Sequence, residues 1–290
     1  MLGRRDFLAA LGSLTLPSVA SAAPAPYVLR DIALEGKIGK RMTLLVPEHT
    51  RDKVPLLVAL HGLGETGDQK LGARAWVDRY GLASSYARLL SPPLTRVFPK
   101  YDYWDNQRLA EINASLSKRP FRGLAIACPY TPNVSKAPSR QAALDEYADW
   151  IVGTVIPRAR SEARILAGSA HVYLDGCSMG GYVGIEVFLR KPTHFGAWGT
   201  LQGALGDSRI QGYADELADV IERHGKRHIH VETSKGDVFR RLNEQFSKML
   251  TRAGVAHDFV MPPGPHNQPF LQDSGTVEML LWHDRLPRRA

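Results

Sequence analysis

Cysteine is scarce in this chain, and neither basic residues nor apolar residues gather in long blocks. The two cysteines, Cys128 and Cys177, are too few for a disulfide scaffold or for a zinc site of four thiolates. The formal net charge of +8 is spread along the sequence, so it gives little support for a nucleic-acid partner, and we expect none. No internal repeat or low-complexity tract is present.

The composition is that of an ordinary globular protein. Hydrophobic residues make up 44% and charged residues 23% of the 290 positions. These values exclude wholesale disorder and a collagen-like repeat. After the N-terminal region, no apolar run reaches the length of about 20 residues that a membrane span requires, so we expect none in the mature chain. The function must therefore be sought in motifs.

The N-terminal residues have the pattern of a targeting segment. Arg4 and Arg5 precede a modest apolar stretch at 7–19, and small residues follow at 20–22. Adjacent arginines before such a stretch resemble the twin-arginine export signal of bacteria. The resemblance implies a signal peptide over 1–22, recognition by the twin-arginine export machinery, and a periplasmic or secreted protein.

Strand-like and helix-like segments alternate over 23–290, which we take as one catalytic domain. Residues 27–35 and 40–47 have the pattern of an antiparallel pair. Further strands are indicated at 54–61, 123–129, 171–175, 195–201, 228–233 and 256–261. The clearest helices are 139–164, 179–191, 207–223 and 237–253, with a last one over 268–285. This alternation predicts an α/β fold with a mostly parallel central sheet and helices on both faces.

Residues 91–122 interrupt the alternation. The segment is rich in proline, tyrosine and charged residues, and we interpret it as an irregular insertion near the active site. Its clustered aromatic residues include Tyr103 and Trp104. One interpretation is that these two side chains bind substrate, and the other is that they only pack on the surface.

A serine lies at a turn between a predicted strand and a predicted helix. Gly176, Ser178 and Gly180 form the pattern G-x-S-x-G in the strand–turn–helix context that a nucleophile elbow requires. A sharp turn lifts the serine hydroxyl out of the sheet, and side chains two residues to either side would collide there. Ser178 is therefore the candidate nucleophile.

The strand over 54–61 leads into the sequence His-Gly-Leu-Gly. These residues resemble the HG-x-G turn of α/β-hydrolases, in which a backbone N–H helps to bind the oxyanion. The resemblance implies that Leu63 and Met179 supply the two N–H groups, with Gly64 as a substitute for Leu63. It also implies that His61 braces the turn rather than acting as a base.

A serine nucleophile needs a base and a carboxylate that orients the base. Asp237 and His266 each follow a predicted strand, and the carboxyl ends of parallel strands share one edge of a sheet. With Ser178 they have the chain order of the α/β-hydrolase triad, and the chain resembles the esterase branch of that superfamily over 27–290. The resemblance implies His266 as general base and acid and Asp237 as its partner. Asp207, which follows the preceding strand, is the alternative acid.

Two other features suggest different chemistry. His228 and His230 alternate on one strand, but no carboxylate or thiolate nearby in the sequence completes a metal site, so we expect no metal and no cofactor. Cys177 adjoins the nucleophile and is interpreted as a small buried residue. The family's sheet order separates the strands of Cys128 and Cys177 by a third, which argues against a disulfide.

These observations predict an exported serine hydrolase that cleaves small-molecule or polymer-linked carboxylic esters through an acyl-enzyme. The same triad could instead transfer the acyl group to an acceptor alcohol. A third hypothesis is a non-catalytic binding protein on a hydrolase scaffold, since a fold does not by itself determine a function.

Overall fold

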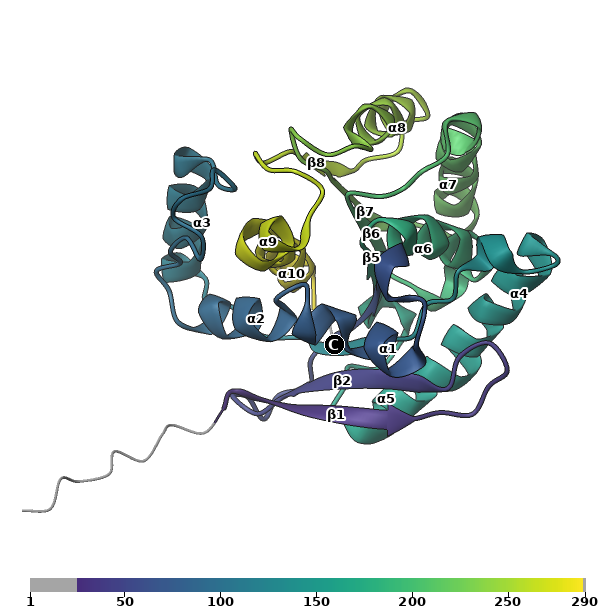
Figure 1. Ribbon diagram of the computed structural model, residues 1–290, viewed down its shortest axis with the longest axis horizontal. Helices are drawn as coiled ribbons and strands as arrows, with labels where there is room; N and C mark the ends of the chain where they lie inside the picture. Colours follow the sequence, from purple (N-terminus) through teal and green to yellow (C-terminus); the bar gives the residue numbers. More distant parts are fainter. Residues whose placement is uncertain (1–24, 289–290) are drawn as a thin grey trace, which may run out of the picture.

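The computed structural model describes residues 25–288. The predicted export signal over 1–22 lies outside them. Within the described chain, three strands come first, and helical segments then alternate with single strands up to the last helix (Figure 1).

Eight strands form one sheet in the order β1-β2-β4-β3-β5-β6-β7-β8. They are β1 (Tyr27–Ala33), β2 (Arg41–Pro47), β3 (Leu56–Leu60), β4 (Ala125–Pro129), β5 (Val172–Gly176), β6 (Ala197–Leu201), β7 (His228–Glu232) and β8 (Asp258–Val260). The β1–β2 and β2–β4 pairs are antiparallel, and every later pair is parallel. The predicted mostly parallel sheet, with an antiparallel pair at its start, is confirmed.

The helices are α1 (Gln69–Asp78), α2 (Leu82–Leu90), α3 (Asn106–Lys118), α4 (Arg140–Trp150), α5 (Ile156–Glu162), α6 (Met179–Arg190), α7 (Ile210–His224), α8 (Arg240–Arg252), α9 (Gln268–Phe270) and α10 (Thr276–Arg285). The π-helical turns Ile151–Val155 and Leu271–Gly275 join α4 to α5 and α9 to α10. Short 3₁₀ turns cover Leu63–Glu65, Val134–Lys136, Ser169–His171, Pro192–His194 and Asp207–Arg209.

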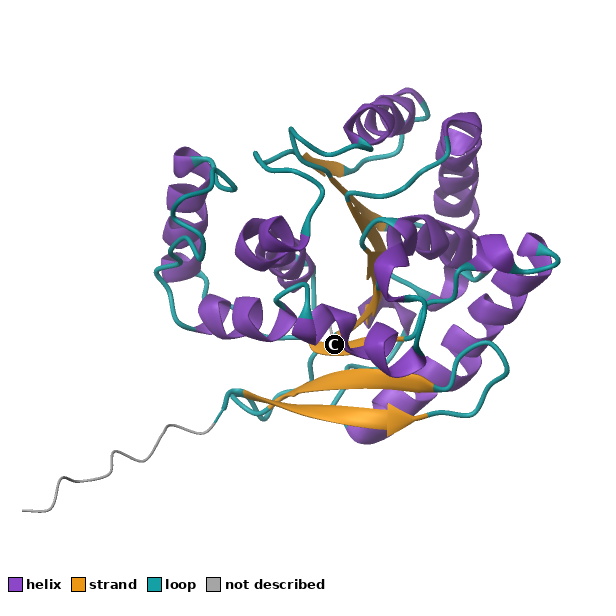
Figure 2. Ribbon diagram, viewed as in Figure 1, coloured by secondary structure: helices purple, strands orange, loops and turns teal. Residues whose placement is uncertain are grey.

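Helices cover both faces of the sheet, as predicted (Figure 2). On β3, Leu56, Val58 and Leu60 pack with α4 to α8, while Leu57 and Ala59 pack with α1, α2, α3 and α10. Because both faces are buried, a central strand needs apolar side chains at every position. This explains the unbroken apolar runs in the sequence. Among the described residues, no helix is both long enough and apolar enough to span a bilayer.

The segment over 91–122 is not irregular throughout, which corrects the prediction. Residues Asn106–Lys118 form α3, whose first turn is capped by the Asp105 carboxylate accepting from the N–H groups of Gln107 and Arg108. The helix packs its apolar side, including Ile112 and Leu116, into the core under α10. The helix was not predicted because its sequence is strongly polar, and the sequence is polar because only one narrow side of the helix is buried.

The loop before α3 is anchored by one buried carboxylate. Asp273, in the turn that precedes α10, accepts from Trp104 Nε1 at 3.0 Å and from the N–H groups of Val97 at 2.9 Å and Phe98 at 3.2 Å. Arg88 pairs with it at 3.6 Å, and the Asp273 side chain is fully buried. Buried donors of this kind are costly to leave unpaired. Asp273 therefore ties the loop to the C-terminal part of the chain.

We predict that Asp273→Ala lowers the free energy of unfolding by about 3 kcal/mol, because the part-buried N–H groups of Val97 and Phe98 and the Arg88 guanidinium lose their carboxylate partner. Chemical denaturation at 25 °C measures the change. The matched control is Asp102→Ala in the same loop, where the carboxylate is 81% exposed, and it should change stability by less than about 0.5 kcal/mol. Equal losses in the two variants would contradict the anchoring role.

Candidate active site

Ser178 lies in the sharp turn between β5 and α6. Its backbone has φ 56° and ψ −119°, a left-handed φ that a residue with a side chain rarely adopts. The turn is held by hydrogen bonds from the Ser178 N–H to the Leu201 carbonyl at 3.0 Å and from the Ala204 N–H to the Ser178 carbonyl at 2.9 Å. Bonds on both sides of the serine offset the strain of the conformation.

The two glycines of the motif are required by close backbone contacts. A Cβ on Gly176 would lie 2.3 Å from the Gly180 carbonyl oxygen, and a Cβ on Gly180 would lie 2.3 Å from the carbonyl oxygen of Leu60. Neither backbone atom can move aside without displacing a strand or the helix start. The spacing of Gly176 and Gly180 in the motif therefore follows from the close approach of α6 to the sheet.

Ser178, His266 and Asp237 are joined by two hydrogen bonds. His266 Nε2 is 3.1 Å from Ser178 Oγ, and His266 Nδ1 is 2.8 Å from Asp237 Oδ1. The Asp237 side chain is fully buried, whereas the His266 side chain is 25% exposed. The structure thus brings together the three residues that the sequence singled out, at distances suited to proton transfer.

The Asp237 carboxylate has further donors. Thr233 donates through Oγ1 to Oδ2 at 2.6 Å, and the Phe239 N–H donates to Oδ1 at 3.0 Å. These hydrogen bonds fix the orientation of the carboxylate toward His266. Asp207 is placed differently: it is 63% exposed and lies 3.4 Å from Arg241, with no contact to His266 among the described residues. The geometry therefore favours Asp237 over Asp207 as the partner of His266.

Polar side chains hold the loop that carries His266. Ser234 Oγ donates to the Gly264 carbonyl at 2.6 Å, and Gln202 Nε2 donates to the Pro265 carbonyl at 3.1 Å. Gln202 itself has a left-handed backbone, with φ 51°. Sequence reasoning missed both residues. Their position just after β6 and β7 was visible, but their partners come from a loop much later in the chain.

Leu63 and Met179 each begin a helical turn near Ser178. Leu63 is the first residue of the 3₁₀ turn, and Met179 is the first residue of α6. The first N–H groups of a helix have no partner within the helix, and they carry partial positive charge. Both residues line the pocket at Ser178, whereas Gly64 does not.

His61 braces the turn that carries Leu63, as the resemblance implied. Its Nε2 accepts from the Thr131 N–H at 2.8 Å, so the proton must lie on Nδ1, which donates to the Gly62 carbonyl at 2.8 Å. Burial lowers the pKa of His61 to about 4, against the weaker effect of the Gly62 hydrogen bond. The ring is therefore neutral near pH 7 and has no free nitrogen for catalysis.

A second buried group supports the same turn. The Gly62 N–H donates to the Tyr80 hydroxyl at 3.2 Å, and that hydroxyl donates to the Glu65 carboxylate. Burial is the largest of the effects that raise the pKa of Tyr80 far above its ordinary value, so the phenol keeps its proton. No pattern in the sequence pointed to Tyr80 or Glu65, because their contact depends on how α1 folds back over the turn.

A pocket of about 390 Å³ opens beside Ser178. It is lined by Leu63, Asn133, Ser135, Arg140, Ser178, Met179, Tyr182, Ala204, Gly206 and Phe239. Tyr103 and Trp104 are not among these residues, so their positions do not support the predicted contact with substrate. Trp104 is fully buried, and Tyr103 packs its ring edge-on against Phe270 at 6.2 Å. Their aromatic surface is used in the core.

Of the remaining candidate groups, His228 is half-buried, and His230, Cys128 and Cys177 are buried. His230 stacks on Trp282 at 4.7 Å, and desolvation lowers its pKa to about 3. Among the described residues, no three His, Cys, Asp or Glu side chains come close enough to bind a metal ion. Cys128 and Cys177 are free, and burial raises the pKa of both thiols. Strand β3 lies between β4 and β5, the strands that carry or precede them.

No protein-family model and no curated protein matches this sequence. Solved structures do resemble the fold. One is an S-formylglutathione hydrolase from Staphylococcus aureus, 16% identical, with a TM-score of 0.59 over 89% of this chain and 96% of that one.

Two further structures are esterases by their names. A ferulic acid esterase is 16% identical, with a TM-score of 0.64 over 89% of this chain and 98% of that one. The feruloyl esterase module from Clostridium thermocellum, complexed with sinapinate, is 15% identical, with a TM-score of 0.60 over 95% of each chain. The described chain thus has the α/β-hydrolase fold that its motifs predicted.

Proposed function

We propose that this protein is a serine hydrolase that cleaves carboxylic esters. The observation that carries the proposal is the continuous hydrogen-bonded path from Ser178 through His266 to the buried Asp237. The path lies at the carboxyl edge of the parallel strands, where α/β proteins bind their ligands. The names of the similar structures, which include a ferulic acid esterase and an S-formylglutathione hydrolase, support the reaction class.

In the proposed first step, the Ser178 hydroxyl oxygen attacks the acyl carbon while His266 Nε2 takes its proton. The buried Asp237 carboxylate stabilises the imidazolium that forms, because it accepts from Nδ1 and is itself held by Thr233. The alcohol then leaves with the proton from His266. The product of this step is an acyl-enzyme on Ser178.

The N–H groups of Leu63 and Met179 are proposed to hold the oxygen that becomes negative during the attack. Removing one such donor typically costs about 2.7–4 kcal/mol of transition-state stabilisation. Water then repeats the sequence on the acyl-enzyme, with His266 again taking a proton. No step uses a metal or a cofactor.

Export is a separate part of the proposal. It rests on Arg4, Arg5, the apolar stretch at 7–19 and the small residues at 20–22. A protein that folds before export does not depend on disulfides, and both cysteines of this chain are free.

We expect Ser178→Ala to lower kcat for p-nitrophenyl esters by at least about a thousandfold, because the nucleophile is lost. The free energy of unfolding should change by less than about 1 kcal/mol, since the hydroxyl makes no core contact. Ser117→Ala on the exposed side of α3 is the control. An unchanged rate in Ser178→Ala would refute the mechanism. Adding acceptor alcohols to the same assay separates hydrolysis from acyl transfer by its products.

Asp237→Asn should lower kcat/KM by roughly a thousandfold, because an amide cannot hold His266 in the required tautomer or stabilise its charge. Asp207→Asn, at an exposed residue paired with Arg241, should change kcat/KM less than about twofold. Steady-state kinetics on one ester decides between them. The opposite ranking would move the acid to Asp207.

If the full chain is expressed in a bacterium with a twin-arginine pathway, the exported protein should begin near Ala23. N-terminal sequencing of the periplasmic fraction measures this. Replacing both Arg4 and Arg5 with Lys should retain the protein in the cytoplasm. An intact Met1 in the periplasm would contradict the cleavage.

A further inference from the structure

Arg140 is the one charged residue among those that line the pocket at Ser178. It is the first residue of α4, after the N-cap Ser139, and α4 packs against α6, whose start carries the nucleophile. The pocket therefore has one cation and no carboxylate in its described lining. The rest of that lining is apolar or neutral.

No acidic side chain of the described chain forms an ion pair with Arg140. Of the three carboxylates that follow on α4, Asp145 pairs with Arg190 at 2.7 Å and Asp149 pairs with Lys191 at 2.5 Å, while Glu146 forms no ion pair with Arg140. Arg190 also forms an ion pair with Glu186 on α6. The neighbouring positive charges are thus neutralised within the protein, whereas that of Arg140 faces the pocket.

Tyr182 places a phenol hydroxyl next to this guanidinium. It stands one helical turn after Ser178, so the two residues share a face of the helix start. Burial and Glu186 raise the pKa of Tyr182, and the nearby Arg140 opposes them. The pocket lining thus combines a guanidinium fork with a neutral hydroxyl, and both donate hydrogen bonds to anions.

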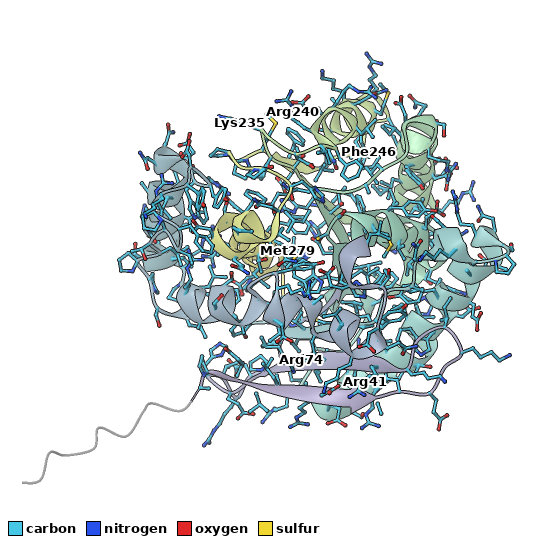
Figure 3. The ribbon with its side chains drawn as sticks, in the orientation of Figure 1. Arg41, Arg74, Lys235, Arg240, Phe246 and Met279 are labelled. Atoms are coloured by element: carbon cyan, nitrogen blue, oxygen red, sulfur yellow. The ribbon has the colours of Figure 1, made fainter. Side chains whose placement is uncertain are left out.

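Other cations stand at the same edge of the sheet. Lys235 lies in the loop after β7 and Arg240 at the start of α8 (Figure 3). Arg240 donates to the Lys235 carbonyl at 2.8 Å and lies 4.0 Å from Glu244. Neither residue lines the pocket at Ser178, so Arg140 is the cation that a ligand in the pocket would meet.

Much of the remaining lining is apolar. It includes Leu63, Met179, Ala204 and Phe239, and Leu63 is 54% exposed. An apolar wall next to a single cation fits a ligand with a hydrocarbon or aryl body and one anionic group. An arginine suits a carboxylate because its fork donates two parallel hydrogen bonds.

We propose that the pocket selects esters that carry a free carboxylate, which Arg140 and Tyr182 bind while Ser178 attacks the ester carbon. The proposal rests on the proposed ester hydrolysis and names the substrate class of that same site. It assigns specificity to a residue that no sequence motif marked.

The test compares anionic and neutral esters in matched pairs. One pair is the mono-p-nitrophenyl ester of adipic acid against p-nitrophenyl hexanoate, which places the carboxylate on the acyl side. The other is 4-butyryloxybenzoate against phenyl butyrate, which places it on the alcohol side. For each enzyme, the measured quantity is the ratio of kcat/KM for the anionic ester to kcat/KM for the neutral one.

Arg140→Gln should lower this ratio about tenfold to a hundredfold in at least one pair, since a hydrogen bond to a charged group is lost. Arg140→Lys should restore part of it, and high salt should lower the ratio of the unmodified protein. The control is Arg241→Gln, at an exposed arginine that pairs with Asp207 and does not line the pocket. Its ratio should equal that of the unmodified protein.

Binding without turnover separates this proposal from the proposed function. Calorimetric titration of 4-butyryloxybenzoate into Ser178→Ala should show weaker binding when Arg140→Gln is added, by a similar factor. If no ester is cleaved but the affinity falls, ester hydrolysis fails and the anion site stands. The anion site is overturned if neutral esters are cleaved but Arg140→Gln changes neither the kcat/KM ratio nor the affinity for 4-butyryloxybenzoate.

Discussion

The close approach of the start of α6 to the backbones of β3 and β5 is the constraint on which the site depends. Gly180 lies against the Leu60 carbonyl with no room for a Cβ, and Ser178, two residues earlier, has a left-handed conformation. Met179, the first residue of α6, and Leu63, the first residue of the 3₁₀ turn, both line the pocket at Ser178. The positions of Ser178 and of the candidate oxyanion donors therefore depend on how closely this helix packs on the sheet.

Two histidines at this edge of the sheet differ in what their nitrogens already do. His61 is buried with both nitrogens engaged by backbone groups, so it can only hold the turn. His266 is partly exposed, and among the described residues its Nε2 forms a hydrogen bond only with Ser178. Hydrogen-bond partners, rather than residue type, thus distinguish a supporting histidine from one that can move a proton.

The sequence was sufficient to predict the strands and the residues that directly follow them, because both depend on local patterns. Apolar runs predicted the strands, and the ends of those runs predicted the neighbourhood of Ser178, Asp237 and His266. It was insufficient where burial depends on distant partners. Trp104 looks like a substrate contact until Asp273, 169 residues later, is seen to bind its ring nitrogen. Tyr80 and the helix over Asn106–Lys118 were hidden for the same reason.

The tie between Asp273 and the loop at Val97 and Phe98 also has a consequence for the order of synthesis. A ribosome releases Ser178 and the loop long before it releases His266 and Asp273. Until those residues are made, the nascent chain has Ser178 without its histidine partner and the loop without its anchor. His266 and Asp273 are seven residues apart, so the site and the loop are completed at nearly the same point of synthesis.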